Sequence, residues 1–289
     1  IEAMKLNWKE GSPNKPHIFF DSDMAKWIES AAYVLHYRRN SELEAKIDAI
    51  IDLIEAGRDE RGYFNSYFLQ FEQDQRWQRR ESHELYCAGH LLEAAIAYAE
   101  ATGKKKFLDL MSDYMDYIHQ IFFIEKSAAF NTPGHEEIEL ALMKLYRYGG
   151  EKKYFDLAAY FIDTRGQVDS QKAKPQELGF FKNFGAGYSQ DQNPVTDQTD
   201  AQGHSVRFGY LYAAVADLAR ERGDDELFHA CQRVLRDVTD RKMYVTGGVG
   251  NLSYGEAFGP SYILPNKEAY TETCASISLA MVYSRMLTM

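Results

Sequence analysis

Three histidines of this 289-residue chain each follow a glycine at corresponding points of the sequence: Gly89-His90, Gly134-His135 and Gly203-His204. Each pair stands where a helical pattern begins, so the three imidazoles are expected together at one end of a set of helices. His83 lies seven residues before His90, on the same helix face two turns away. Imidazoles hydrogen-bond well to hydroxyl groups. The spacing therefore indicates a substrate-binding surface, with separate structural histidines as the alternative.

Glu256 is the candidate general acid. It lies in a glycine-rich loop, with Gly255 before it and the apolar pair Ala257-Phe258 after it. Partly apolar surroundings disfavour the charged form of a carboxyl, so we expect a raised pKa that suits proton donation to a leaving group. The alternative is an ordinary loop glutamate.

Glu272 and Cys274 are candidate metal ligands at the start of the last helical pattern. On a regular helix, side chains two residues apart point about 200° away from each other, but in extended backbone they share a side. Both can bind one ion only if the helix begins at or after Cys274. A carboxylate and a thiolate suit zinc. The alternative is a small buried cysteine. The other two cysteines, Cys87 and Cys231, are too scattered for a disulfide framework.

The elements that must position these residues are helices. Apolar side chains recur with helical spacing in nine segments, and we predict helices over 23–36, 41–57, 84–102, 104–120, 135–148, 151–164, 203–222, 224–240 and 270–288. Two long stretches lack this pattern, 165–200 and 244–269. The first of them includes Pro175 and Gly179. Loops of this length in a compact domain are usually functional.

The predicted helices pair into repeated hairpins. The first helix of a pair ends at a glycine, at Gly103, at Gly149-Gly150 and at Gly223, where a left-handed residue is needed. It is also more apolar than its charged partner. This alternation predicts an inner and an outer ring, and hence an all-α (α/α)6 barrel or toroid in one domain over residues 1–289. A closed toroid of this type has about twelve helices, so nine indicate a barrel that is incomplete at one or both ends.

Composition limits the partners. The formal net charge of −10 argues against nucleic acid and anionic membranes, because both need clustered Lys and Arg. No apolar run approaches the roughly 18 residues that span a bilayer. The aromatic content of 14% suits a sugar-binding cleft, although it also suits an ordinary interior. The chain begins with Ile1 and shows no signal peptide, so its compartment, cytoplasmic or periplasmic, stays open.

Several uncommon strings follow one another through nearly the whole chain. They include Gly62-Tyr63-Phe64-Asn65, His83-Glu84-Leu85-Tyr86-Cys87-Ala88-Gly89-His90, Pro133-Gly134-His135-Glu136-Glu137-Ile138-Glu139, Gly203-His204, Gly255-Glu256-Ala257-Phe258 and Glu272-Thr273-Cys274. In kind and order they resemble the family 127 glycoside hydrolases, the zinc-thiolate β-L-arabinofuranosidases. The resemblance implies a retaining exo-glycosidase with an (α/α)6-barrel catalytic domain, acting on terminal β-L-arabinofuranosides of plant-type glycans.

The resemblance also implies roles for single residues. In that family a zinc-bound cysteine thiolate is the nucleophile, and a glutamate, which Glu256 matches, is the general acid/base. Glu272 and Cys274 match two of the zinc ligands. His83, His135 and His204 match family positions that touch the sugar. His90 is a weaker match.

One departure from the family is serious. Its nucleophilic cysteine and an adjacent ligand form a Cys-Cys pair downstream of the string that Glu272-Thr273-Cys274 matches, and this sequence contains no such pair. We therefore expect a fragment that is inactive by itself and holds zinc weakly or not at all. Two alternatives stay open: a carbohydrate-binding toroid without catalysis, and another toroid sugar enzyme, such as an epimerase or an unsaturated-uronide hydrolase. Neither needs a metal, so zinc content separates them from the arabinofuranosidase.

Overall fold

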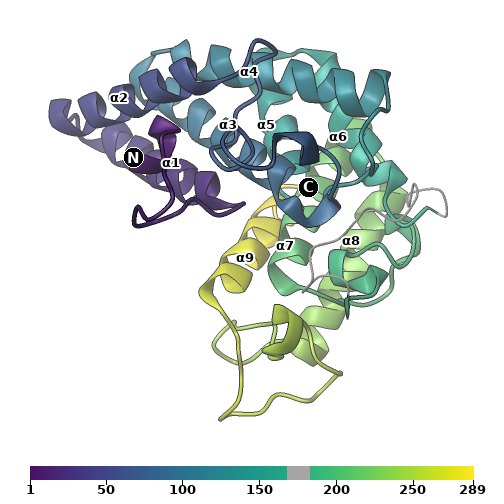
Figure 1. Cartoon of the computed structure of the whole chain (residues 1–289). Coiled ribbons are helices and arrows are strands. Elements are labelled where there is room, and N and C mark those ends of the chain that lie inside the picture. The colour runs from purple at the N-terminus through teal and green to yellow at the C-terminus, as the bar shows by residue number, and fades with distance from the viewer. Residues whose placement is uncertain (168–182) are drawn as a thin grey trace.

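Helices make up most of the chain in the computed structural model, which describes residues 1–167 and 183–289 (Figure 1). Nine α-helices lie in these ranges: α1 (Phe20–Tyr37), α2 (Ser41–Gly57), α3 (Glu84–Thr102), α4 (Lys106–His119), α5 (Ile138–Gly149), α6 (Lys152–Thr164), α7 (Ser205–Arg222), α8 (Asp225–Asp237) and α9 (Thr273–Met286). The same ranges contain isolated β-bridges but no strand. The predicted all-α class and all nine predicted helices are confirmed.

The predicted loops are also present where the structure describes them. Short 3-10 turns are the main regular structure between residues 183 and 200 and between 244 and 269. The part of the first loop that holds Pro175 and Gly179 lies outside the described residues. Among the described helices, none combines the length and the apolar character that crossing a membrane requires.

The helices form two layers. The odd-numbered helices pack side by side in chain order, α1 on α3, α3 on α5, α5 on α7 and α7 on α9. Each even-numbered helix packs on the odd-numbered helix before it, which gives four consecutive hairpins and a fifth inner helix. In Figure 1 this series runs from α1 and α2 round to α9 as an arc. The predicted inner and outer layers are therefore confirmed.

Burial explains why the two layers differ in sequence. Every residue of α3 from Glu84 to Ala99 is buried, because an inner helix has neighbours on all sides. The outer helix α8 buries one stripe at helical spacing, formed by Leu227, Ala230, Cys231, Val234 and Leu235. The small residues of the inner helices allow this close packing, and the charged face of each outer helix meets solvent.

Local chemistry sets the helix ends. The side chains of Asn40 and Asp224 accept hydrogen bonds from the first backbone N–H groups of α2 and α8, which begins both helices. At the other end, Gly103, Gly150 and Gly223 have φ values of 77°, 78° and 62°. This left-handed conformation ends α3, α5 and α7, as predicted.

One part of the predicted repeat is wrong. Gly89-His90 does not begin a helix but lies inside α3, and the residue before α3 is His83. Gly89 is needed for packing instead, because a Cβ there would lie 2.8 Å from Cγ of Glu137 and 2.9 Å from the backbone nitrogen of Ile138. The segment that leads into α5 thus rests directly on α3. That segment is also longer than predicted, since α5 begins at Ile138 rather than at residue 135.

Candidate functional site

Three of the four predicted histidines stand at or near the beginning of inner helices. His83 directly precedes α3, His204 directly precedes α7, and His135 lies in the segment before α5. The ring centroids of His83 and His135 are 5.7 Å apart, and those of His135 and His204 are 5.4 Å apart. The structure therefore brings these three imidazoles together at the N-terminal ends of inner helices, and His83 takes the place that the spacing predicted for His90.

His90 lies deeper in the protein, inside α3. Its ring is 4.5 Å from the ring of Tyr86, which in turn is 4.3 Å from the ring of His135. The ring of Tyr210, on α7, is 5.9 Å from both His90 and His135. Sequence reasoning singled out neither tyrosine. Their position within the first two turns of an inner helix, three and six residues after a site histidine, is the signal that could have found them.

Backbone hydrogen bonds fix which nitrogen of each imidazole carries the proton. Nδ1 of His83 and Nδ1 of His135 lie 2.7 and 2.9 Å from backbone carbonyl oxygens. A carbonyl only accepts, so Nδ1 donates in both residues and the acceptor lone pair is on Nε2. In His204 the roles are reversed. Its Nδ1 accepts from two N–H groups of the first turn of α7, at 3.2 and 3.4 Å, which places the proton on Nε2.

The three imidazoles are neutral at ordinary pH. Burial and the nearby charge of Arg207 lower the pKa of His83 to about 4. The same two causes, in the same order, hold the pKa of His135 well below its usual value. Burial also lowers the pKa of His204. Together with the backbone hydrogen bonds, this gives the site two imidazole acceptors and one imidazole donor.

Glu256 faces His204 from the loop before α9. Oε2 of Glu256 accepts from Nε2–H of His204 at 2.8 Å, and Oε1 accepts from the hydroxyl of Tyr270 at 2.8 Å. An antiparallel bridge between Ala257 and His204 holds this loop against the start of α7. The hydrogen bond from His204, supported by that from Tyr270, lowers the pKa of Glu256 to about 2. The expected raised pKa is wrong, because the carboxyl is 43% exposed and held by donors.

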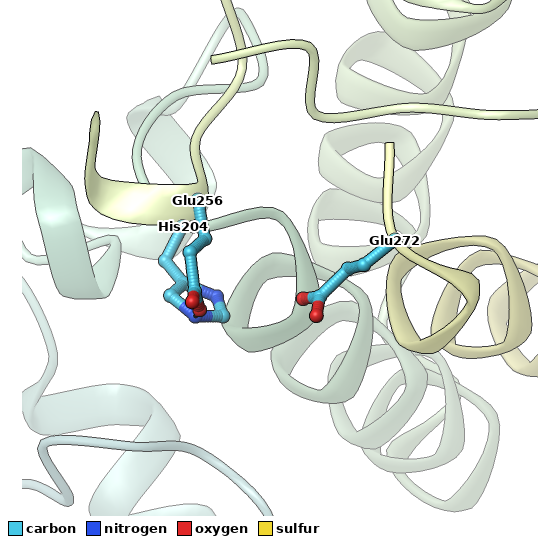
Figure 2. Close-up of side chains that lie close together, drawn as sticks. All are labelled: His204, Glu256 and Glu272. Atoms are coloured by element: carbon cyan, nitrogen blue, oxygen red, sulfur yellow. Dashed lines mark hydrogen bonds and ion pairs between the residues drawn. The ribbon is translucent and has the colours of Figure 1, made fainter. Parts of the chain in front are cut away.

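Glu272 is the extended residue directly before α9. Its carboxylate points toward Glu256 and His204 (Figure 2). Cys274 is exposed in the first turn of α9, which begins at Thr273, one residue earlier than joint ligation by Glu272 and Cys274 was expected to allow. Burial and then the charge of Glu272 raise the pKa of the Cys274 thiol. The two predicted ligands are therefore close enough to interact electrostatically.

The structure also groups His204, Glu256 and Glu272, with one nitrogen or oxygen atom of each within 4.8 Å of the others (Figure 2). Such spacing is typical of metal ligands. Ligation by Nε2 of His204 needs a lone pair there, and moving its proton to Nδ1 would break both hydrogen bonds to α7. We therefore interpret His204 and Glu256 as a hydrogen-bonded pair, with the carboxylate of Glu272 beside it.

The donors that suit zinc are the carboxylate of Glu272 and the thiol of Cys274. Protein zinc sites usually have about three or four protein ligands. Cys87 and Cys231 are 1% and 0% exposed. The thiol of Cys87 donates to the carbonyl oxygen of Ile18. In residues 1–167 and 183–289, a zinc ion at this place would thus find two donors of the predicted kind.

The chain is similar to known proteins over nearly its whole length. The family described as the GH127 catalytic domain of β-L-arabinofuranosidase matches residues 3–289. The chain is 39% identical over 285 residues to the non-reducing end β-L-arabinofuranosidase of Bifidobacterium longum subsp. longum, covering 93% of this chain and 43% of that protein. The structure of a GH127 β-L-arabinofuranosidase from Geobacillus stearothermophilus T6, Ara127N, matches with a TM-score of 0.93 and 44% identity, covering 99% of this chain and 46% of that one.

A second solved structure, the GH127 β-arabinofuranosidase BT3674, matches with a TM-score of 0.87 and 33% identity, covering 99% of this chain and 45% of that one. The chain spans less than half the length of these relatives. The arc of helices matches the (α/α)6-barrel domain of GH127 enzymes, which confirms the predicted fold. By its profile, its sequence identity and its fold, the chain belongs to the GH127 β-L-arabinofuranosidase family.

Proposed function

We propose that the protein is a retaining glycoside hydrolase that removes terminal β-L-arabinofuranose from plant-type glycans. In this proposal the chain supplies the sugar-binding and acid/base side chains. The observation that carries it is the hydrogen-bonded carboxylate of Glu256, held by His204 and Tyr270 beside the carboxylate of Glu272. The similarity to β-L-arabinofuranosidases over nearly the whole chain supports the choice of sugar.

Glu256 is the proposed acid/base. In the free protein its pKa of about 2 keeps it ionised, whereas protonation of a leaving oxygen needs the acid form. A bound glycoside that takes the place of Tyr270 removes one of the two donors and buries the carboxyl, and both changes raise the pKa of Glu256. Oε1 is then the oxygen that carries the proton, because Oε2 stays bonded to Nε2–H of His204.

The histidines are the proposed sugar contacts. His83 and His135 have their acceptor lone pairs on Nε2 and are neutral, so each can accept a hydrogen bond from a sugar hydroxyl. Protonation would turn these acceptors into donors. His90 is separated from His135 by the ring of Tyr86, so it would support the surface rather than touch the sugar.

Glu272 and Cys274 are the proposed ligands of a zinc ion in the complete enzyme, together with cysteines beyond this chain. When bound, zinc keeps a cysteine thiol ionised at neutral pH, which makes the thiolate available as a nucleophile. The contribution of the chain itself is to hold the Glu272 carboxylate beside that of Glu256.

Two substrates with different leaving groups test the role of Glu256. In a protein extended to the length of its relatives, we expect Glu256→Gln to slow hydrolysis of methyl β-L-arabinofuranoside by about 10²–10⁴-fold. Hydrolysis of the 4-nitrophenyl glycoside should slow much less, because nitrophenolate leaves without a proton. Glu268→Gln is the matched control, since Glu268 is an exposed residue of the same loop. Equal losses on both substrates, or a wild-type rate on the methyl glycoside, would refute this role.

A sugar-binding toroid without hydrolysis is the second candidate for the 289-residue chain itself. Two observations favour it: Glu256 is ionised, and Glu272 and Cys274 are fewer donors than the three or four that a zinc site usually has. It predicts that this chain binds methyl β-L-arabinofuranoside in calorimetry without releasing L-arabinose. If the extended protein hydrolyses the glycoside, the complete protein is the enzyme. If the extended protein binds the glycoside without hydrolysing it, the sugar-binding toroid is favoured.

A further inference from the structure

A buried cation, Arg207, lies among the site histidines. Its side chain is 1% exposed in the first turn of α7, three residues after His204. Nη1 of Arg207 donates to Oε2 of Glu81 at 2.7 Å and to Oγ of Ser189 at 3.1 Å. The same nitrogen also donates to the carbonyl oxygen of Gly134. One guanidinium group thus joins three segments that are far apart in the sequence.

Each of these three partners neighbours a residue of the site. The pairs are Glu81 with His83, Gly134 with His135, and Ser189 with Tyr188. The ring of Tyr188 lies 5.6 Å from the ring of His204, and the guanidinium carbon of Arg207 lies 4.4 Å from the centre of the Tyr188 ring. The segments that carry His83, His135 and Tyr188 therefore meet at Arg207.

Packing around Arg207 leaves little freedom. A Cβ at Gly134 would lie 2.6 Å from the carbonyl oxygen of Arg80 and 2.8 Å from the carboxyl carbon of Glu81. Oε1 of Glu81 also accepts from the hydroxyl of Ser189 at 3.2 Å. Because Glu81 bonds to Ser189 and packs on Gly134, moving the guanidinium would move all three segments.

We propose that Arg207 is the positioning residue of this site. Its guanidinium fixes the relative places of the segments that carry His83, His135 and Tyr188, and its permanent charge adds to burial in favouring the form of the two imidazoles that accepts hydrogen bonds. The proposal deepens the proposed function and rests on it for the identity of the sugar. The placement of the imidazoles and their protonation can be measured without any activity.

The titration of His83 and His135 reports on the charge of Arg207. The titratable and aromatic groups that face these two imidazoles from neighbouring elements are Phe19, Glu81, Tyr86, His204, Arg207 and Tyr210. Burial is the largest cause of the low pKa of each imidazole, and Arg207 is the next. Glu81 opposes Arg207 at His83, which makes His135 the clearer reporter.

The test is a pH titration of the imidazole nitrogens of the 289-residue chain by long-range ¹H–¹⁵N NMR. In the wild-type chain we expect His135 to keep its proton on Nδ1 and to remain neutral as the pH falls from 8 through the range in which an exposed histidine titrates. The variant Glu81→Gln/Arg207→Gln removes both charges, so that no lone charge stays buried. In it, His135 should titrate about one pH unit higher or more, and methyl β-L-arabinofuranoside should bind more weakly.

Two further variants separate charge from placement and from stability. Arg207→Lys keeps the charge but cannot reach all three acceptors, so we expect the wild-type titration of His135 with weaker sugar binding. Arg147→Gln/Glu221→Gln is the matched control. It removes an ion pair of 2.9 Å between α5 and α7 and leaves Asp217 paired with Arg285. It should lower the melting temperature and leave the titration of His135 and sugar binding unchanged.

The proposal fails if the Glu81→Gln/Arg207→Gln chain folds and retains both the wild-type titration and the wild-type sugar affinity. It also fails if the control variant shifts His135 equally. If the double variant does not fold, Arg207→Lys decides, and wild-type affinity in that variant would overturn the placement role. A proposed function that is wrong would instead appear as absent hydrolysis in the extended protein, with these NMR results unaffected.

Discussion

A series of hydrogen bonds links the backbone of α7 to Tyr270 through His204 and Glu256. The backbone N–H groups hold the proton of His204 on Nε2, and that proton holds Glu256 in its charged form. A ligand that takes either donor away from Glu256 raises the pKa of this carboxyl. At the scale of single residues, occupation of the site and protonation of the proposed acid are therefore linked events.

Asp21 gives a prediction about stability at the same scale. It is 1% exposed, and its Oδ2 accepts from the N–H of Ser66 at 2.7 Å. Burial raises the pKa of Asp21 from 3.8 to about 6. The fold therefore prefers the neutral acid, so the contribution of Asp21 to the free energy of unfolding is fully present below pH 3.8 and is lost as the pH rises through about 6. Asp21→Asn keeps an acceptor for Ser66 and should remove about 2–3 kcal/mol of this loss.

Urea denaturation at pH 4 and at pH 7 measures this effect. The difference in the free energy of unfolding between the two pH values should be smaller in Asp21→Asn than in the wild-type chain. Asp23→Asn is the control, because Asp23 is exposed two residues further along α1. If both variants keep the wild-type difference, Asp21 is ionised in the fold and the predicted pH dependence is wrong.

The sequence predicted which residues meet at the site better than it predicted their ionisation. The repeat of Gly-His pairs before helical patterns placed His135 and His204 together correctly, but it put His90 where the structure has His83. The pKa of Glu256 was predicted with the wrong sign, because its neighbours in the chain are apolar. Its strongest partner, His204, is 52 residues away and is brought close only by the fold. Arg207 was missed for the same reason.

At the scale of elements, the contact between α3 and the start of α5 depends on Gly89. A Cβ at this position would overlap Glu137 and Ile138, so we expect Gly89→Ala to destabilise the protein by about 1–3 kcal/mol. Gly149, the last residue of α5, makes the matched control, because a Cβ added there would meet no atom of the described residues within 4 Å. Gly149→Ala should leave stability unchanged or raise it by up to about 1 kcal/mol. Thermal melting distinguishes the two, and equal melting temperatures would contradict the packing role.

Helix prediction succeeded where a local signal marks the element. The glycines at the ends of α3, α5 and α7 have the left-handed conformation that their place in the pattern required. The prediction for Gly89-His90 was wrong because a glycine inside a helix that allows close packing looks the same in the sequence as a glycine just before a helix. Only the position of the facing chain, here Glu137 over Gly89, separates the two cases.

At the scale of the whole molecule, metal content tests how the site is completed. We expect the 289-residue chain to retain zinc well below one equivalent after dialysis, because Glu272 and Cys274 supply two donors. A protein extended to the length of its relatives should retain about one equivalent. Elemental analysis measures both, with Cys231→Ser as a control, since Cys231 is buried on α8. If the 289-residue chain instead retains one equivalent of zinc, and the His204→Gln variant loses it, His204 is a zinc ligand.

The serial packing of the inner helices has a consequence for how the site is assembled. Each inner helix packs on the inner helices before and after it, so the free energy of local opening is highest for helices with inner neighbours on both sides. Among the described helices, α3 and α5 have such neighbours, whereas α9 packs on α7 and leaves Ile277 55% exposed. In a preparation of these 289 residues, the helix that follows Glu272 and carries Cys274 therefore opens more readily than the helices beside His83 and His135. A ligand that contacts both groups of residues opposes this opening, so its affinity can change through substitutions that never touch it.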